Sequence, residues 1–157
     1  MSKAYVNQIE PKSGDKITTD KYIQQKGLPY FRAGRSSGDV SVNTNVVFNT
    51  VFEDNNGDYD SSTGKFTAPI DGTYFFGITA LSSATANQRD TISVYKDSTA
   101  NDILHMRSEG DKAAHNTMSG TLVIELTAGQ TIFCRVSDGV IYGGNNKWTQ
   151  FCGYLIA

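Results

Sequence analysis

The segment from Asp54 to Asp60 places oxygen-bearing side chains at alternating positions, which is the pattern of a calcium-binding loop. It reads Asp-Asn-Asn-Gly-Asp-Tyr-Asp, and Ca²⁺ prefers carboxylate and amide oxygens as ligands. An EF-hand loop, however, requires glycine at its sixth position, where this segment has Tyr59. A turn between two strands is therefore the favoured interpretation, with calcium as the alternative, and no cofactor is expected.

Two histidines, His105 and His115, have no third ligand nearby at the spacing of a metal site, and are interpreted as surface or loop residues. The glycine patterns that cradle phosphates, Gly-x-Gly-x-x-Gly and Gly-x-x-x-x-Gly-Lys-Ser/Thr, do not occur. Neither histidine lies in a recognisable nucleophile motif. The sequence therefore gives no positive indication of an enzyme.

The two cysteines, Cys134 and Cys152, are too few for a disulfide framework, and each follows a phenylalanine in an expected strand. This setting favours two buried free thiols that behave as small apolar groups. A cross-strand disulfide between them is the alternative, and a catalytic thiol has little support.

The loop from Asp138 to Trp148 combines aromatic residues with glycine and asparagine, and it contains the only tryptophan of the chain. Aromatic side chains beside such residues are typical of loops that bind sugars or proteins. Tyr142, Asn145, Asn146 and Trp148 are therefore candidate ligand contacts. The alternative is that Trp148 begins the last strand and packs against the domain.

The composition indicates one compact all-β domain with a sizeable core. The chain has 157 residues, of which 38% are hydrophobic, and it contains 15 glycines, eight tyrosines and eight phenylalanines. The formal net charge of -2 provides no long-range attraction to nucleic acid or to an anionic membrane. No apolar run approaches the length of a membrane span, so neither partner is expected.

Short strand patterns separated by turn residues recur from Leu28 onward, and no convincing helix is present. In residues 73–81, Tyr74 and Phe76 alternate with Phe75, so they lie on opposite faces of the strand. The expected strands are 28–33, 40–42, 45–52, 65–68, 73–81, 91–95, 103–107, 121–126, 130–136 and 149–156. About ten short antiparallel strands predict an all-β sandwich of the jelly-roll type.

An aromatic signature with fixed spacing is the strongest indication of a family. It consists of Phe48, Asp54, Tyr59, Phe66, Gly72, Tyr74 and Phe76. This pattern resembles that of the complement component 1q globular head, a jelly roll of the tumour necrosis factor superfamily. Ile78 departs from it, since the family has an aromatic residue there, and Cys152 stands where the family has serine. The resemblance covers residues 28–157 and implies a trimeric binding or structural module far more often than an enzyme.

A homotrimer is also expected from the excess of aromatic residues. A two-sheet sandwich needs one apolar face per sheet, yet Phe75 and Phe133 are out of phase with their core-facing neighbours. Outward-facing aromatics form an exposed patch unless something covers them, and three copies around a threefold axis would do so. Phe75, Phe133 and Tyr154 are therefore predicted at the trimer interface; coverage by loops is the alternative.

Residues 1–27 are polar, with isoleucines spaced too widely to build a core. They are expected to form an extended docking arm in which Ile9, Pro11, Ile17 and Ile23 contact another surface. The segment 8–18 resembles short β segments of bacteriophage fibre and virion proteins. The chain thus divides into an arm, 1–27, and a jelly roll, 28–157.

These features favour a bacteriophage virion protein, specifically a trimeric capsid decoration (cement) protein that docks on the major capsid protein or other virion proteins. The first residues lack the apolar core of a signal peptide, which favours assembly in a host cytoplasm and location in the virion. The alternative is the receptor-binding head of a phage tail or head fibre, with the 138–148 loop contacting a host surface glycan or protein. A soluble ligand of the complement or cytokine type is a third hypothesis, and an enzyme is the last.

Overall fold

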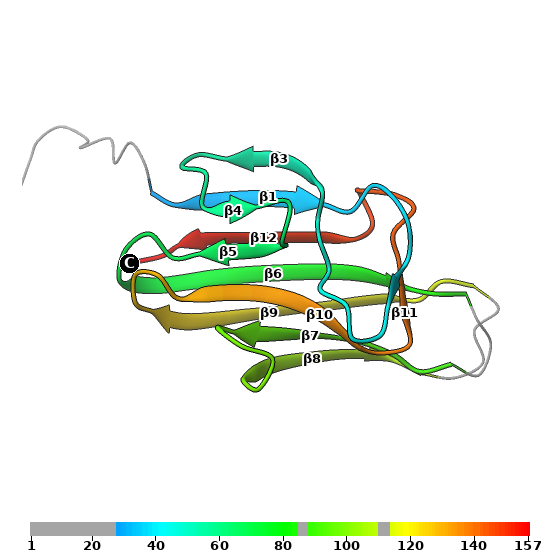
Figure 1. Cartoon of the computed structure of the whole chain (residues 1–157). Coiled ribbons are helices and arrows are strands. Elements are labelled where there is room, and N and C mark those ends of the chain that lie inside the picture. The colour runs from blue at the N-terminus through cyan, green and yellow to red at the C-terminus, as the bar shows by residue number, and fades with distance from the viewer. Residues whose placement is uncertain (1–27, 85–87, 110–113) are drawn as a thin grey trace, which may run out of the picture.

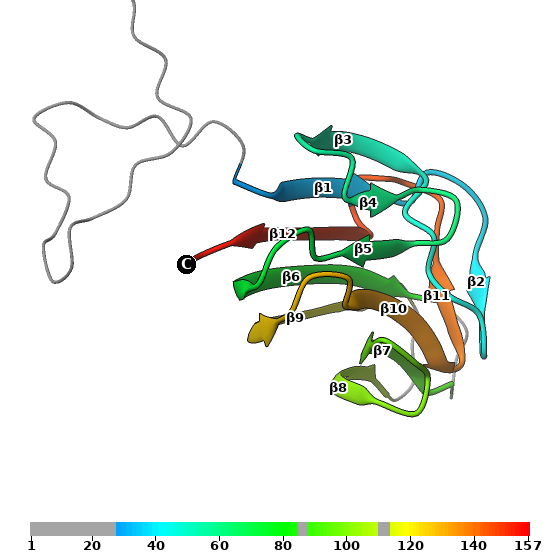
Figure 2. The same cartoon turned by 60° about the vertical axis from the view of Figure 1, so that its left-hand side comes forward.

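The computed structural model describes residues 28–84, 88–109 and 114–157, which form twelve strands and no helix (Figure 1). The strands make two antiparallel sheets that pack face to face (Figure 2), as predicted for a jelly-roll sandwich. Within these ranges no helix that could cross a membrane is present.

One sheet has seven strands, in the order β2-β11-β6-β12-β1-β3, and β9 pairs with β6 on the side away from β12. The long strand β6 is its centre. The strands are β1 (Tyr30–Gly34), β2 (Val40–Ser41), β3 (Thr50–Asp54), β6 (Gly72–Ser82), β9 (Thr117–Leu126), β11 (Val140–Tyr142) and β12 (Gln150–Leu155).

The other sheet has five strands, in the order β4-β5-β10-β7-β8. They are β4 (Tyr59–Asp60), β5 (Lys65–Thr67), β7 (Asp90–Lys96), β8 (Asp102–Ser108) and β10 (Thr131–Asp138). Both edge strands of this sheet, β4 and β8, connect by short turns to the neighbours with which they pair.

Alternation along the strands decides what enters the core. Tyr74, Phe76 and Ile78 on β6 are buried, whereas Phe75 between them is only partly covered. Ile132 and Cys134 on β10 are buried in the same cluster from the opposite sheet. The face assignments expected from the sequence are therefore confirmed for these two strands.

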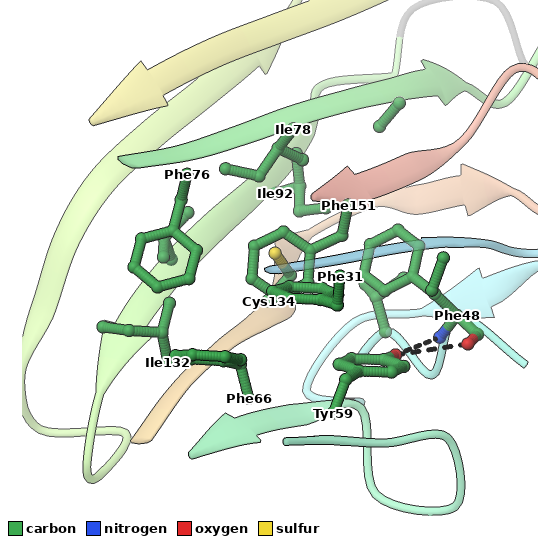
Figure 3. Close-up of a cluster of buried hydrophobic side chains, with 14 of the residues drawn as sticks. Phe31, Phe48, Tyr59, Phe66, Phe76, Ile78, Ile92, Ile132, Cys134 and Phe151 are labelled. Carbon is green, nitrogen blue, oxygen red and sulfur yellow. Dashed lines mark hydrogen bonds between the residues drawn. The ribbon is translucent and has the colours of Figure 1, made fainter. Parts of the chain in front are cut away.

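Aromatic rings fill the space between the sheets (Figure 3). Phe31 stacks on Tyr59 with ring centroids 4.9 Å apart and on Phe66 at 5.1 Å, and it meets Phe151 edge-on at 4.8 Å. The Tyr59 hydroxyl donates to the carbonyl oxygen of Phe48 at 3.2 Å and accepts its N–H at 3.0 Å. Burial raises the pKa of this phenol, which keeps it neutral and available for both bonds.

Gly153 on β12 is required by this packing. It lies opposite Phe76, and a Cβ atom at this position would come within 2.6 Å of ring atoms of Phe76 and 2.9 Å of Phe31. The missing side chain leaves the space that the two rings occupy.

The expected strand 45–52 is wrong in its first half, because the chain there changes sheets. Val46 donates its N–H to Cys134 at the edge of β10, and Asn45 bridges to Arg135 in the five-stranded sheet. From Thr50 the chain pairs with β1 in the seven-stranded sheet as β3. Val46 is fully buried, so the apolar pattern that predicted a strand is present. These residues, however, belong to the segment that crosses from one sheet to the other.

Replacing Phe66 by alanine should lower the free energy of unfolding by about 3–5 kcal/mol, because the ring is fully buried and contacts Phe31, Tyr74 and Phe76. Phe52→Ala is the matched control, since Phe52 is only half-buried on the edge strand β3. Chemical denaturation at one fixed protein concentration measures both variants. Equal losses for the two variants would contradict this account of the core.

Candidate functional site

An apolar row crosses the outer face of the seven-stranded sheet. Tyr30, Tyr154, Phe75 and Val123 lie directly opposite one another on β1, β12, β6 and β9. Directly opposed residues share a face, and the core-facing neighbours of these four point inward. Val123 is 61% exposed, Tyr154 47% and Tyr30 44%, so the row presents a contiguous apolar surface to solvent.

Two of the four residues in this apolar row were predicted from the sequence. Phe75 and Tyr154 stack with their ring centroids 5.0 Å apart. Tyr30 and Val123 were not identified, because only the pairing of β1 and β9 places them beside the other two. Periodicity within one strand gives its two faces but not its neighbours.

Phe133 does not belong to this surface. It lies on β10 in the five-stranded sheet, stacks on Tyr95 at 5.5 Å, and has the ammonium group of Lys65 5.1 Å from its ring centre. These neighbours leave it only 2% exposed. Its position on the outer face was expected, but its cover comes from the same sheet rather than from another protomer.

A hollow of about 480 Å³ adjoins the apolar row on the same outer face. Gly77 on β6 and Gly120 on β9 form part of it, and Cys152 on β12 points into it. The Cys152 thiol donates to the carbonyl oxygen of Gly77 at 3.5 Å, and partial burial raises the pKa of this thiol. The remaining lining residues are Phe75, Ile78, Thr79, Ser119, Thr121 and Gln150.

The two cysteines face away from each other, so they do not form a disulfide within one chain. Cys134 is fully buried on the inner face of the five-stranded sheet, whereas Cys152 is on the outer face of the seven-stranded sheet. The preferred interpretation of free thiols is confirmed, although only Cys134 is completely buried. Burial also raises the pKa of Cys134.

Strand β11 lies at the far end of the same sheet (Figure 1), and a cluster of three aromatic side chains is found there. The ring centroids of Tyr142 and Trp148 are 6.0 Å apart, and those of His115 and Tyr142 are 4.2 Å apart. Trp148 is 49% exposed and therefore does not pack into the domain as the alternative interpretation required. The role of His115 was not predicted, because the loop to which it belongs is distant in sequence.

Hydrogen bonds between side chains and the backbone hold the loop that carries this cluster. Thr149 donates its hydroxyl to the carbonyl oxygen of Tyr142 at 2.9 Å, and Gly143 donates its N–H to Asp39 at 3.1 Å. Gly143 packs against the carbonyl group of Gly38 so closely that a Cβ atom would overlap it. The rings are thus presented by a preformed loop.

The asparagines of the predicted ligand loop have different roles. The Asn145 side-chain oxygen accepts the N–H of Lys147 at 2.9 Å, which shapes the turn before β12. The backbone of Asn146 packs tightly on Gly34, while its carboxamide has no hydrogen-bond partner among the described residues. Asn145 therefore keeps its amide N–H groups for a ligand, whereas the whole carboxamide of Asn146 is available.

Hydrogen bonds from backbone N–H groups to the Asp54 side chain hold the turn from Asp54 to Asp60. The Asp54 carboxylate accepts the N–H groups of Gly57, Asp58 and Tyr59 at 2.9–3.1 Å, so its oxygens are already engaged. Across the described part of the chain, no three His, Cys, Asp or Glu side chains gather as a metal site would require.

A serine, a histidine and a carboxylate are linked on the five-stranded sheet. Ser93 Oγ lies 2.8 Å from His105 Nδ1, and His105 Nε2 contacts Asp102. The resemblance to a catalytic triad is superficial, because Ser93 is completely buried and its hydroxyl also bonds to Ser137 at 2.7 Å. A substrate has no access to this oxygen.

A second serine pattern was overlooked in the sequence. Residues 34–38 read Gly-Arg-Ser-Ser-Gly and match the nucleophile-elbow motif Gly-x-Ser-x-Gly. The motif requires a strand-to-helix turn with a histidine beside the serine. Here Ser36 lies in an exposed turn between two strands, and its hydroxyl donates to Asn49 at 3.2 Å. The match is therefore fortuitous.

The predicted docking residues Ile9, Pro11, Ile17 and Ile23 lie outside the described residues. The division of the chain at residue 27 stays a prediction.

Comparison with known proteins identifies the domain. A family model of the C1q domain matches residues 30–156. Complement C1q tumor necrosis factor-related protein 3 from mouse and from human are each 25% identical over 126 residues, which is 80% of this chain and 50% of either relative. The chain thus spans about half the length of these relatives.

Solved structures agree with the observed fold. The globular domain of zebrafish complement 1qA superposes with a TM-score of 0.68 at 22% identity, covering 83% of this chain and 98% of that one. Murine APRIL gives a TM-score of 0.68 at 10% identity, with 83% and 100% covered. Domains of this family are ligand-binding or structural modules rather than enzymes.

Iodoacetamide should alkylate Cys152 while Cys134 remains unmodified in the folded protein, because only Cys152 borders the outer hollow. Its reaction should be slower than that of a free thiol at neutral pH, since its raised pKa reduces the thiolate fraction, and should accelerate as the pH rises. Peptide mass spectrometry over time resolves the two sites. Faster modification of Cys134 would contradict the two face assignments.

Proposed function

Because the chain belongs to the C1q domain family, we propose that it is a homotrimeric binding or structural module without catalytic activity. C1q/TNF-like domains form homotrimers. The observation that carries the proposal for this chain is the exposed row of Tyr30, Tyr154, Phe75 and Val123 on the outer face of the seven-stranded sheet.

Assembly through this row has a sufficient driving force. Completely burying an aromatic or large aliphatic side chain contributes about 1.5–3 kcal/mol, and each protomer supplies four such side chains in different degrees of exposure. A threefold arrangement closes on itself, so every protomer covers its neighbour and no apolar row remains in solvent. The small side chains of the adjacent hollow allow close approach of a neighbouring subunit.

Phe75→Glu should convert the trimer to a folded monomer, because three carboxylates would be buried without partners at the interface. Sedimentation equilibrium gives the mass, and circular dichroism confirms that the fold is retained. Val42→Glu is the control, since Val42 is an exposed apolar residue in the turn after β2 and does not belong to the apolar row. In the monomer, Cys152 should also be alkylated faster than in the trimer. A trimer that survives Phe75→Glu would overturn the proposed interface.

We further propose the narrower role of a bacteriophage capsid decoration protein located in the virion. Its support is the polar composition of residues 1–27, whose widely spaced isoleucines suit docking on the major capsid protein or another virion protein. The mouse and human relatives are named as complement-related proteins and give no indication of a virion role. This narrower proposal therefore rests on the N-terminal sequence alone.

Deleting residues 1–27 should leave a soluble trimer that no longer binds the particle. Co-sedimentation of the truncated and full-length chains with decoration-depleted particles measures the difference. Binding that survives the deletion would refute docking through this segment. Hundreds of copies per particle would indicate decoration, whereas a few to a few tens would favour the alternative role of a receptor-binding fibre head.

A further inference from the structure

The cluster of Tyr142, Trp148 and His115 combines a phenol with an indole and an imidazole, whereas the polar groups of the apolar row are only the hydroxyls of Tyr30 and Tyr154. Among the described residues, the Tyr142 hydroxyl and one of the two ring nitrogens of His115 have no hydrogen-bond partner. The Tyr142 hydroxyl has no hydrogen-bond partner in the described part of the chain, and it lies against Gly144, where a Cβ atom would overlap it. Half-buried phenol groups normally find a partner.

The tautomer of His115 follows from its contact with the backbone. Its Nδ1 atom lies 2.7 Å from the carbonyl oxygen of Ser82, which can only accept, so Nδ1 carries a proton. In the neutral imidazole the Nε2 atom is then an acceptor, and within the described residues it has no partner. The Asn146 carboxamide, in the turn before Trp148, is likewise unpartnered there.

We infer that Trp148, Tyr142 and His115 form a saccharide-binding site. A pyranose has a flat face of C–H groups and a rim of hydroxyls. The partially positive C–H face suits the negative face of the exposed indole ring. The hydroxyl rim suits a phenol oxygen and an imidazole acceptor, which exchange hydrogen bonds without introducing a net charge. The ligand class is thus a sugar ring, as in an exposed glycan.

The competing occupant of this surface is a second copy of the chain. Tyr142 is opposite Leu81, so the cluster is on the same outer face as the apolar row. Phe75 and Leu81 are six residues apart on β6, and at about 3.3 Å per residue the two surfaces are separated by about 20 Å. The acceptor nitrogen of His115 and the carboxamide of Asn146, groups of a kind that the apolar row does not contain, favour the sugar, because a dry subunit interface would leave them unsatisfied.

The single tryptophan makes the test direct, since all indole fluorescence comes from Trp148. The full chain is titrated with D-glucose, D-galactose, D-mannose and N-acetyl-D-glucosamine. At least one should give a saturable change in emission, with a dissociation constant on the order of 1 mM because a single ring buries little surface. D-mannitol, an open-chain polyol without a flat face, should give none.

Single substitutions test which side chains contact the sugar. Tyr142→Phe keeps the ring and removes the hydroxyl, so binding should weaken by about three- to tenfold, the value of one hydrogen bond. Trp148→Ala should abolish binding, read by saturation-transfer NMR of the sugar because the fluorophore is lost. Tyr30→Phe, in the apolar row, is the matched control and should bind normally.

The outcomes separate this site from the proposed trimer. The three side chains belong to one protomer, so sugar binding should persist in the monomeric Phe75→Glu variant. The proposal is overturned if no sugar in the panel gives a saturable response in the trimer or the monomer. It is also overturned if Trp148 emission shifts to the blue as subunits assemble, since the cluster would then be buried between copies of the chain.

Discussion

The packing of Phe31 between the two sheets is the contact on which the remaining structure depends. Its ring stacks on Tyr59 and Phe66 from the five-stranded sheet and meets Phe151 from its own sheet. These contacts join the sheets at the centre of the sandwich, and Gly153 leaves the room that they need. Because close-packed rings tolerate little displacement, this cluster fixes which face of every neighbouring strand points inward.

The outer surface follows from that constraint. Once Phe76 is in the core, strand alternation places Phe75 outside, and the pairing of β6 with β12 and β9 brings Tyr154 and Val123 beside it. The apolar row is therefore a consequence of register, and a shift by one residue would bury these side chains and expose the core. The proposed self-association would therefore use a surface that the core packing produces.

The sequence was sufficient for the fold class because alternation and turn residues are local signals. It identified the inner faces of β6 and β10 and the outward position of Phe75. It failed at residues 45–49, where a buried segment crosses between sheets and has the composition of a strand. The sequence also did not predict which residues become neighbours in space. Tyr30 and Val123 join the apolar row through strand pairing. Phe133 is covered by Lys65 and Tyr95 within its own sheet.

Two parts of one sheet face thus differ in what they can bind. The row around Phe75 gains mainly from losing contact with water, which any complementary apolar surface provides. The cluster around Trp148 has aromatic faces bordered by the Tyr142 hydroxyl and the Nε2 atom of His115, which have no hydrogen-bond partner among the described residues, so an apolar cover would desolvate them without compensation. A ligand that offers a C–H face together with hydroxyl groups satisfies both requirements. In these two proposals the same fold would support assembly at one position and polar recognition at another. The difference lies in the imidazole and indole groups, since phenol hydroxyls occur at both positions.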